Sequence, residues 1–409
     1  MVASSLADLR AISARLGAEQ QVAFASMPPN GWRFDDDGVL RHEQSDYFDI
    51  VGVVSRDGTR NILLRQPETA LVGLVVTRVG GVRHALLTAK CEPGLHGGCQ
   101  FSTTVQATPS NYLRRHGGAP TPHLDLVLNP LVTHVTLHDS IQFDWGQYYL
   151  GKTKRFVIIE IDSPVDAIAP AVWVPEPVLV ELLTADFAVT TDLRAILPIL
   201  LAHDQGVALD DASASRIDID RARQLRVSAL EHCDLREVSG WDAATNEASV
   251  MVRSIDVASP SREVGDWQQP LLDVAAPLAS RLPIMPGGIS PDGEVRFGIH
   301  ARTALGLREV ELWYPADEFA SSSPEATVSS VRTSAEGARF LHHEVTLELA
   351  FAAEGASRAT EVDAVPGLVQ WVTLPELVAL CVRDECTSVE LRLALSLAIV
   401  SGAVLDARA

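Results

Sequence analysis

A polar segment at residues 105–118 carries residue types that can bind an anion and transfer a proton. Its sequence is VQATPSNYLRRHGG. Thr108 suits an N-cap, Pro109 suits the first helical position, and Gly117 follows the last turn. These signals predict a short helix over 109–116.

That helix would present both a proton-transfer face and an anion site. Tyr112 and His116 are four residues apart and would share one face. The N–H groups at the start of a helix attract anions, and Arg114 and Arg115 add positive charge nearby. We therefore expect a phosphate or diphosphate near the start of this helix. An ordinary surface helix with solvated arginines is the alternative interpretation.

Lysine is rare in this chain, which makes each lysine informative. Lysine occurs at positions 90, 152 and 154, and the other 30 of the 33 basic residues are arginines. Because arginine serves as the cation elsewhere, a retained lysine indicates a place that requires a compact, titratable ammonium group. Retention of a few lysine codons by chance would give the same count.

Other catalytic motifs are absent from the sequence. His134 and His138 are four residues apart, but they lie in a stretch that alternates like a strand and offers no evident third ligand, so we expect no metal site. His-Gly-Gly occurs at 96–98 and 116–118 without a Gly-x-Ser-x-Gly motif, which disfavours a serine hydrolase. The lack of a Gly-x-Gly-x-x-Gly turn or a Walker loop disfavours the usual nicotinamide and ATP folds.

Predicted strands precede the polar segment. Residues 5–25 have a helical period and predict an opening helix. Short β-branched or apolar runs separated by turn residues then predict strands at 49–54, 61–64, 73–77, 84–89, 132–137 and 155–161. A helical stretch over about 176–203 closes this part of the chain.

The chain contains an internal repeat. Residues 173–194 align without gaps on residues 371–392, and nine of the 22 positions are identical. Weaker matches upstream keep the same order, Gln66-Pro67 with Gln269-Pro270 and residues 89–95 with 301–307. We therefore predict two copies of one α+β domain, over 1–205 and 206–409.

The two copies differ in the polar groups that catalysis needs. Glu92 in the first copy aligns with Ala304 in the second, and Gln100 aligns with Leu312. We therefore expect the active site in the first copy and a scaffold or an accessory pocket in the second.

Composition limits the class of protein. The 409 residues include 53 acidic and 33 basic groups, and the formal net charge of −20 argues against a nucleic-acid partner. No apolar run is long enough to span a membrane, and the N-terminal residues do not resemble a signal peptide. The five cysteines form no Cys-x-x-Cys pair, so we expect reduced thiols and a cytoplasmic location.

Several motifs of the chain occur together in one known family. They are AKCEPG at 89–94, Gln100, TVQATPSNY at 104–112, HGG at 116–118, Gln66-Pro67, Asp139, Ile141, Gln142, Gly146, Lys152, SREV at 261–264, Trp267, Gln269 and Pro270. This combination resembles the NDP-hexose 2,3-dehydratase family over most of the chain. The run VQATPSNY is the most specific part of the resemblance.

The resemblance implies a fold and a reaction. The fold would be a tandem pair of Nudix-like α+β domains, usually in a homodimer. The substrate would be a dTDP-4-keto-6-deoxyhexose in deoxysugar and antibiotic biosynthesis, with neither metal nor nicotinamide cofactor. The C3 proton is removed, the C2 hydroxyl leaves, and the enol relaxes to a 3,4-diketo-2,6-dideoxy sugar. A partner 3-ketoreductase then reduces this unstable product.

The chain departs from the family pattern in several pocket-like segments. These departures are at Leu95 and at residues 102–104, 143–145, 154–156 and 313–317. A relative repurposed for another elimination, isomerisation or cyclisation on a natural-product intermediate is therefore an alternative. A non-catalytic sugar-nucleotide-binding protein is a second alternative, against which the retained residues Lys90, Glu92, Gln106 and Tyr112 argue.

The implied chemistry needs a base for the C3 proton and donors for the enolate and the leaving hydroxide. Glu92 is the first candidate base and His116 the second. Tyr112 and Lys90 are candidate donors, and Lys90 could instead only orient a carboxylate. Candidate substrate-binding residues are Gln106, Thr108, Ser110, Asn111, Arg114, Arg115, Gln142, Asp144, Trp145, Lys152, Arg155 and Trp267. Among these, the arginines and Lys152 are candidates for the diphosphate, and either tryptophan for stacking on the base.

Overall fold

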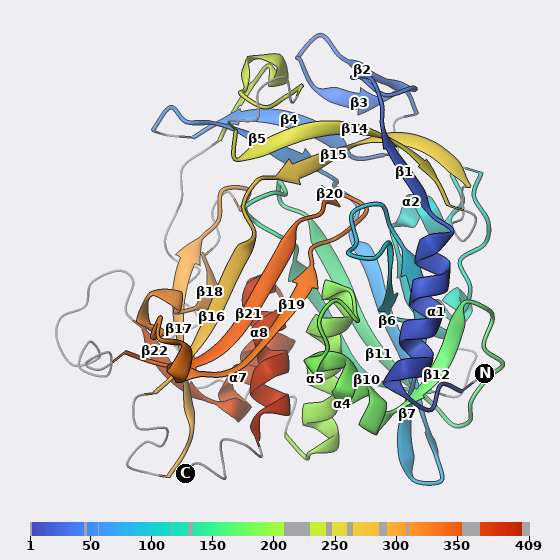
Figure 1. The fold of residues 1–409 in the computed structure, drawn as a ribbon, viewed down its shortest axis with the longest axis vertical. Coiled ribbons are helices and arrows are strands. Elements are labelled where there is room, and N and C mark those ends of the chain that lie inside the picture. Colours follow the sequence, from blue (N-terminus) through green and yellow to red (C-terminus); the bar gives the residue numbers. More distant parts are fainter. Residues whose placement is uncertain are drawn as a thin grey trace.

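The computed structural model shows an α+β protein (Figure 1). It describes residues 2–44, 47–55, 57–115, 117–129, 134–207, 230–242, 248–259, 265–285, 293–307, 311–353 and 369–402. Strands and helices follow one another in both halves of the chain, which confirms the predicted fold class.

The first half is built on a mixed sheet. Its strand order is β10-β11-β6-β7-β12, with β8 paired to β7 and β9 paired to β6. Strands β6 and β11 run parallel, and the other neighbours run antiparallel. The bounds are β6 Ala70–Val79, β7 Val82–Cys91, β8 Cys99–Ser102, β9 Val105–Ala107, β10 His134–Phe143, β11 Thr153–Ile161 and β12 Ala171–Pro175. Helices α4 (Glu176–Thr184) and α5 (Thr191–Asp204) follow β12.

The second half contains a sheet of the same design. Its order is β18-β17-β16-β21-β19, with β22 paired to β17, and β16 runs parallel to β21. The bounds are β16 Leu278–Ile284, β17 Arg296–Thr303, β18 Glu311–Pro315, β19 Thr327–Ser334, β21 Glu344–Phe351 and β22 Gln370–Thr373, followed by α7 Leu374–Val382 and α8 Val389–Val400. Strands β6, β7, β11, β10 and β12 therefore have counterparts in β16, β17, β21, β19 and β22, with the same neighbours and directions. This order supports the predicted duplication, whose exact boundary stays a prediction.

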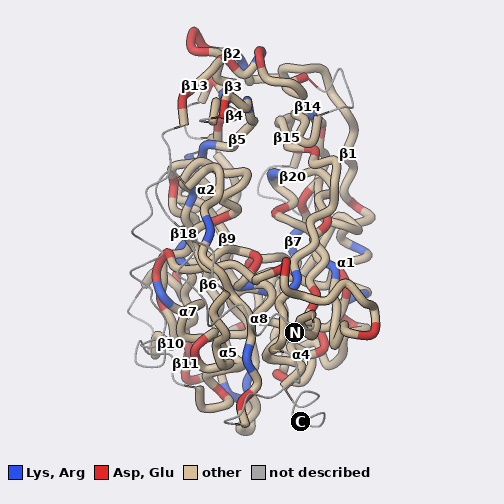
Figure 2. The backbone as a smooth tube through the Cα atoms, turned by 90° about the vertical axis from the view of Figure 1, so that its left-hand side faces the viewer, with Lys and Arg blue, Asp and Glu red and all other residues tan. Residues whose placement is uncertain are grey.

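Two smaller sheets lie opposite each other at one end of the molecule (Figure 2). One contains β2 Trp32–Phe34, β3 Leu40–His42, β4 Asp49–Val54 and β5 Arg60–Arg65, and the other contains β14 Val250–Ala258, β15 Asp266–Val274 and β20 Phe340–Leu341. Each half also supplies one strand to the other sheet. Strand β1 (Gln21–Phe24) pairs with β14, and β13 (Glu231–Cys233) pairs with β4. A division at 205/206 thus cuts across both sheets.

Helices α5 and α8 pack together in the centre of the molecule (Figure 1). Nearly every residue of both helices is buried, as expected for helices that are apolar on all sides. Thr190 and Ser388 cap them by accepting hydrogen bonds from the N–H groups of Leu193 and Leu391. One continuous hydrophobic cluster runs through both halves, so the halves share a core.

Three predicted helical segments differ from the structure. The opening helix is α1 (Leu6–Ala18), and the end of the predicted segment instead forms β1, because β14 offers it a partner. The segment at 176–203 is two helices, α4 and α5. The helix predicted over 109–116 is the single turn α2 (Pro109–Tyr112), and Arg114 beyond it has a positive φ of 57°. The remaining short elements are α3 Leu124–Leu128, η2 Leu235–Glu237, η3 Asp317–Phe319 and η4 Pro324–Ala326.

Candidate active site

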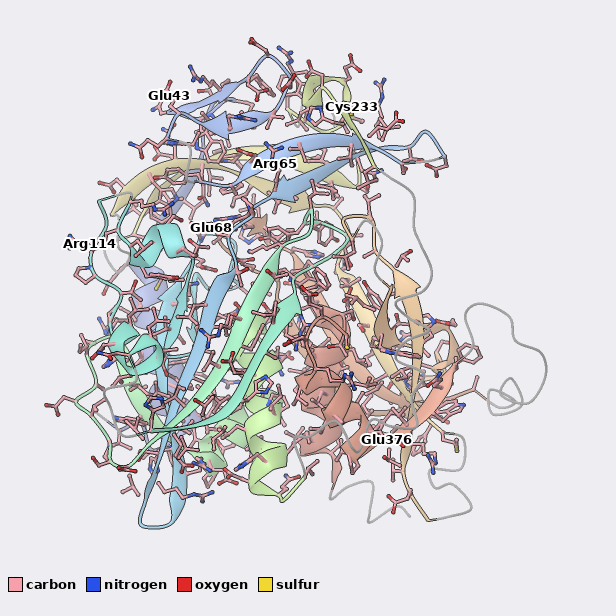
Figure 3. All side chains as sticks on the ribbon, turned by 180° about the vertical axis from the view of Figure 1, so that it is seen from behind. Glu43, Arg65, Glu68, Arg114, Cys233 and Glu376 are labelled. Atoms are coloured by element: carbon pink, nitrogen blue, oxygen red, sulfur yellow. The ribbon has the colours of Figure 1, made fainter. Side chains whose placement is uncertain are left out.

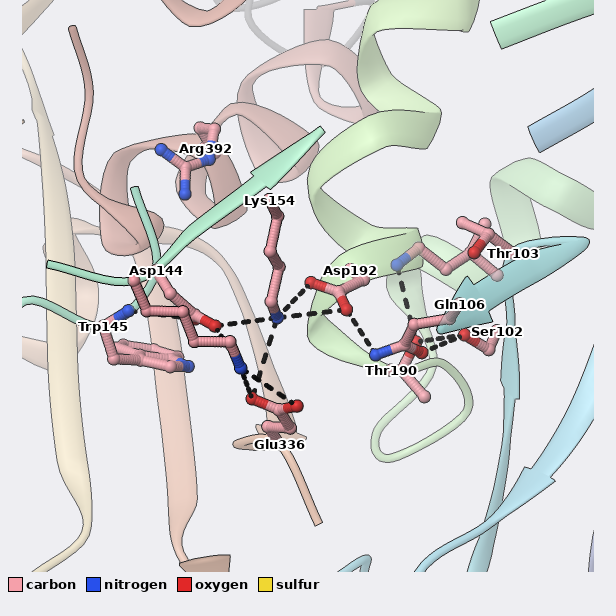
Figure 4. A network of polar contacts seen from close by, with 12 residues as sticks. Ser102, Thr103, Gln106, Asp144, Trp145, Lys154, Thr190, Asp192, Glu336 and Arg392 are labelled. Carbon is pink, nitrogen blue, oxygen red and sulfur yellow. Dashed lines mark hydrogen bonds and ion pairs between the residues drawn. The ribbon is translucent and has the colours of Figure 1, made fainter. Parts of the chain in front are cut away.

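Four buried charged side chains and Glu336, whose side chain is 11% exposed, form a cluster where the two halves meet (Figure 4). Lys154 Nζ on β11 lies 2.8 Å from Asp192 Oδ1 and 3.1 Å from Asp144 Oδ2. Lys152 Nζ lies 3.0 Å from Asp144 Oδ2 and 3.1 Å from Glu336 Oε2. Glu336 follows β19 in the second half, whereas the other four residues belong to the first. We call these five residues the charge cluster.

The groups of the charge cluster stabilise one another's charges. Burial opposes the charged form of each group, so isolated ions would be costly here. Asp144, Asp192 and Glu336 outweigh this cost for Lys154 and raise the pKa of its ammonium group well above the usual value. The two lysines likewise hold the pKa of Glu336 well below the usual value, despite its burial. For Asp192 burial outweighs the attraction of Lys154 and raises the pKa.

Tyr149 adds a hydroxyl group to the charge cluster. This hydroxyl donates a hydrogen bond to Glu336 Oε2 at 2.7 Å. Lys152 Nζ lies 4.2 Å from the centroid of the tyrosine ring, in a cation–π contact. Burial, together with nearby Glu336 and Asp144, raises the pKa of the phenol well above its usual value. Tyr149 therefore acts as a hydrogen-bond donor at neutral pH.

Gln106 on β9 links the charge cluster to the polar segment. Its Nε2 donates a hydrogen bond to Asp192 Oδ2, and its Oε1 accepts one from Ser102 Oγ at 2.7 Å. Thr190 Oγ1 donates in turn to Ser102 Oγ at 3.1 Å. Gln106 is half-buried, whereas Ser102, Thr190 and Asp192 are buried. Gln106 is thus the member of this hydrogen-bonded chain that reaches accessible space.

Glu92, the first candidate base, lies in a separate polar pair. Lys90 Nζ lies 2.8 Å from Glu92 Oε1, and the two side chains are 17% and 2% exposed. The backbone N–H of Glu92 donates to the carbonyl oxygen of Gly98 at 3.1 Å, which closes the loop after β7. Lys90 can therefore orient the carboxylate or present a proton close to it.

One segment of the second half contacts both the loop after β7 and the charge cluster. The N–H of Gly94 donates to the carbonyl oxygen of Gly337 at 2.9 Å. Gln100 Nε2 donates to Ser334 Oγ at 3.0 Å. Residues 334–337 include Glu336, so the second half touches the surroundings of Glu92 as well as both buried lysines.

The predicted anion site at the start of α2 holds a carboxylate of the chain itself. Glu68 Oε1 accepts a hydrogen bond from the N–H of Ser110 at 3.0 Å, and Glu68 Oε2 accepts one from Ser110 Oγ at 2.6 Å. Thr108 Oγ1 lies 3.0 Å from the same hydroxyl. Figure 3 labels Glu68 beside the turquoise turn of α2. Because Glu68 uses this N–H and would repel a second anion, the geometry does not support a diphosphate here.

Other residues predicted around α2 lie toward the outer surface. Asn111, Arg114 and Arg115 are exposed, and Figure 3 shows Arg114 at the margin of the molecule. Tyr112 is half-buried against an apolar cluster on the outer face of the first sheet. Since α2 ends at Tyr112, this tyrosine does not share a helix face with His116, which lies outside the described residues.

The remaining predicted binding residues contact different parts of the chain. Gln142 is buried and donates to the carbonyl oxygen of Arg383 in the second half at 2.8 Å. Trp145 belongs to the hydrophobic core. Arg155 is paired with Asp139 at 2.6 Å on the exposed side of β11. Trp267 on β15 packs half-buried against another apolar cluster. Each of these four side chains is thus engaged by other groups of the chain itself.

A comparison with protein families gives a match to the part of the chain that contains the polar segment and the Lys90–Glu92 pair. Residues 7–200 match the model of a family described as NDP-hexose 2,3-dehydratase. This matched part, just under half of the chain, is similar to the NDP-hexose 2,3-dehydratase family. The matched residues include Gln106 and the four charge-cluster residues of the first half. Glu336, the fifth, lies beyond the matched residues.

Curated relatives from this family resemble the chain over much of its length. A dTDP-4-dehydro-6-deoxy-alpha-D-glucopyranose 2,3-dehydratase of Streptomyces violaceoruber is 29% identical, covering 77% of this chain and 80% of the relative. A protein of the same description from Amycolatopsis orientalis is 28% identical, covering 91% of this chain and 84% of the relative. A third, from Saccharopolyspora spinosa, is 27% identical and covers 60% and 51%.

Two solved structures each resemble part of this chain. A Nudix hydrolase of M. smegmatis, RenU, covers 38% of this chain and 96% of its own, with 16% identity and a TM-score of 0.24. An ADP compounds hydrolase covers 40% and 80%, with 12% identity and a TM-score of 0.21.

The sequence predicted part of the charge cluster. Asp144 and Lys152 were expected in the site, and Gln106 joins them through Asp192. The rarity of lysine was a signal for Lys154 as well. Asp192 had a weaker signal, because the repeat aligns it with another acid, Glu390. Nothing in the sequence connects Tyr149 or Glu336 to these residues, because their contact depends on how the halves pack.

The part of the chain that the structure describes contains neither a metal-binding group nor a membrane-spanning helix. It holds no group of three or more His, Cys, Asp and Glu side chains arranged to bind a metal ion. His138 is buried, lies 2.9 Å from Ser140 Oγ, and has its pKa lowered to about 4 by burial. Within those same residues, no helix is long and apolar enough to cross a membrane.

Proposed function

We propose that this chain is a sugar-nucleotide 2,3-dehydratase, a hydro-lyase acting on a dTDP-4-keto-6-deoxyhexose. The observation that carries the proposal is the match to the family over residues 7–200, together with three curated relatives that share one described activity. One of these relatives aligns with 91% of the chain, so the similarity extends beyond the first half.

The reaction removes one molecule of water from the sugar. The C4 ketone makes the C3 proton acidic, because the enolate oxygen carries the charge that develops when a base takes that proton. The C–O bond at C2 then breaks, and the hydroxide leaves with a proton from a general acid. The resulting enol gains a proton at C2 and becomes the 3,4-diketo-2,6-dideoxy sugar.

Glu92 is the proposed base in this reaction. It is a buried carboxylate held 2.8 Å from the rare lysine Lys90, and the repeated half has Ala304 in its place. Lys90 is the proposed donor to the C4 oxygen or to the leaving hydroxyl. Substrate must open the loop at 92–98 to reach the carboxylate, because Glu92 is nearly inaccessible in this structure.

Binding and assembly complete the proposal. Gln106 is the proposed contact to the sugar, since it is the half-buried member of a polar chain whose other members are buried. A homodimer, a cytoplasmic location, a role in antibiotic biosynthesis and a coupled 3-ketoreductase are further parts of it, supported by the family resemblance.

One observation favours a second candidate, another elimination or isomerisation on a related intermediate. The segment at 142–146 departs from the family pattern and supplies Asp144 to the charge cluster. A changed residue in a buried network can alter the groups that it positions. The product of the reaction distinguishes the two candidates.

The test is incubation with dTDP-4-keto-6-deoxyglucose, a 3-ketoreductase and NADPH, followed by mass spectrometry. The proposal predicts a reduced sugar nucleotide that has lost the mass of one water. A reduced product that keeps the C2 hydroxyl, or unchanged substrate at high enzyme concentration, would defeat the proposal. A product isomeric with the substrate would favour the second candidate.

A further inference from the structure

The carboxamide of Gln106 is held at both ends. Its Oε1 accepts a hydrogen bond from Ser102 Oγ at 2.7 Å, and one Nε2 hydrogen goes to Asp192 Oδ2. An amide nitrogen carries two hydrogens, which leaves the second for another acceptor. Because Gln106 is only half-buried, that second hydrogen is the one that a bound molecule could use.

Asp192 determines whether Nε2 or Oε1 of the Gln106 carboxamide faces its carboxylate. A glutamine amide can rotate by half a turn and exchange its oxygen and nitrogen with little change in shape. The Ser102 hydroxyl tolerates either arrangement, since a hydroxyl both donates and accepts. An ionised carboxylate only accepts, so it requires the nitrogen of Gln106 on its side.

Lys154 opposes the effect of burial on the pKa of Asp192 and holds its carboxylate in place. Lys154 Nζ lies 2.8 Å from Asp192 Oδ1 and 3.1 Å from Asp192 Oδ2, in contact with both oxygens. Lys154 is held in turn by Asp144 at 3.1 Å, and Glu336 of the second half lies 3.8 Å away. A residue of the second half therefore influences the orientation of Gln106 through two ion pairs (Figure 4).

We propose that Asp192 is a positioning residue, which fixes the Gln106 carboxamide so that an N–H points toward a sugar oxygen of the bound sugar nucleotide. This role deepens the proposed function and rests on it. Lys154 supports the same role by contacting Asp192, and Glu336 supports it by lying close to Lys154. The second half thus contributes to the site even though it lacks a counterpart of Glu92.

The primary variant is Asp192→Asn. An asparagine can offer its own N–H₂ to Gln106, so the Gln106 amide can turn and present an oxygen lone pair to the sugar instead of an N–H. We expect kcat/KM for the sugar nucleotide to fall about 100-fold, the order of magnitude seen when one preorganised donor is lost. Thermal stability falls as well, because Lys154 loses one of its carboxylates.

A double variant separates positioning from folding. Asp192→Asn combined with Gln106→Glu exchanges the amide and the carboxylate, which restores the total charge and one amide–carboxylate hydrogen bond. The proposal predicts that the melting temperature recovers while turnover stays low, because an oxygen now faces the sugar. If turnover recovers together with the melting temperature, Asp192 is structural and the proposal is overturned.

The second half offers a matched control at the position that the repeat aligns with Asp192. Glu390 is also a buried acid in the first turn of a buried helix. Glu390→Gln should change the melting temperature and leave kcat/KM within about twofold of wild type. Wild-type kinetics in Asp192→Asn, well below its melting temperature, would overturn the positioning role alone. A wild-type chain without dehydratase activity would instead defeat the proposed function, and this role with it.

Discussion

Residues that are identical in the two copies of the repeat explain how the halves are joined. Asp186 accepts a hydrogen bond from the N–H of Arg332 at 2.8 Å. Its counterpart Asp384 accepts one from the N–H of Ile141 at 2.7 Å. Each aspartate therefore reaches a strand of the other half. The aspartate that the two copies share therefore lies at the interface between the halves, whereas the proposed catalytic groups lie where the copies differ.

Neighbouring residues of β11 allow a direct test of the charge cluster. Lys154→Met should lower the free energy of unfolding by about 3–5 kcal/mol, because buried Asp144 and Asp192 lose their shared cation. Arg155→Met is the matched control on the solvent side, where loss of the exposed pair with Asp139 should cost at most about 1 kcal/mol. Urea titration measures both values. Equal losses would contradict the assigned importance of the buried lysine.

Glu92→Gln tests the proposed base. The change should lower turnover about 10²–10⁴-fold and leave dTDP affinity nearly unchanged, because the base acts on the C3 proton and contacts neither thymine nor diphosphate. Exchange of the C3 hydrogen with solvent deuterium, measured together with dTDP affinity and melting temperature, provides the readout. Exchange at the wild-type rate would exclude Glu92 and make His116 the next candidate. A large loss of thermal stability would indicate that Glu92 mainly serves as the partner of Lys90.

Two equivalent hydrogen bonds between glycines, which we call the clasp, join loops of the two halves. The N–H of Gly94 donates to Gly337 O at 2.9 Å, and the N–H of Gly306 donates to Gly146 O at 2.6 Å. A Cβ at Gly306 would lie 1.8 Å from the carbonyl oxygen of Tyr149, a backbone atom that cannot move aside alone. The repeat pairs Gly94 with Gly306, so the sequence match marks this contact.

Gly306→Ala should therefore be strongly destabilising. We expect a loss of about 2–3 kcal/mol or more, since the added methyl group must push the two loops apart. Gly265→Ala is the control, because no described atom lies within 4 Å of a Cβ there, and its effect should stay within about 0.5 kcal/mol. The two melting curves decide the matter, and a Gly306→Ala chain as stable as wild type would contradict the clasp.

Local sequence patterns predicted which helices and strands form better than they predicted where each one begins and ends. The β-branched or apolar runs at 49–54 and 73–77 became β4 and β6, and the predicted start of the opening helix agrees with α1. The helix expected over 109–116 ends at Tyr112, and the anion expected at its start is replaced by Glu68, which is distant in sequence. Contacts of this kind depend on tertiary structure and leave no periodic signal.

Exchange of strands makes the whole molecule one folding unit. Strand β1 of the first half completes the sheet of β14, and β13 completes the sheet of β4. The duplication itself was visible from the repeat, but this exchange was not, because no sequence pattern identifies the partner of an isolated short strand. The charge cluster crosses the same junction, which explains why the sequence missed Glu336.

Separately expressed halves should therefore be unstable. Residues 1–205 would lack β13 and residues 206–409 would lack β1, and each would expose an unpaired strand edge and part of a shared core. We expect each half to show no cooperative thermal transition alone, whereas the full chain should unfold in one transition. Calorimetry provides the measurement. Two halves that each melt cooperatively would contradict the shared core.

The most direct test of the central claim is the reaction of the wild-type chain with dTDP-4-keto-6-deoxyglucose in D₂O, with the product trapped by a 3-ketoreductase and analysed by mass spectrometry and NMR. Dehydration through an enol predicts a product that has lost one water and carries solvent deuterium at C2. A product that retains the C2 hydroxyl, or one without deuterium at C2, would contradict this mechanism.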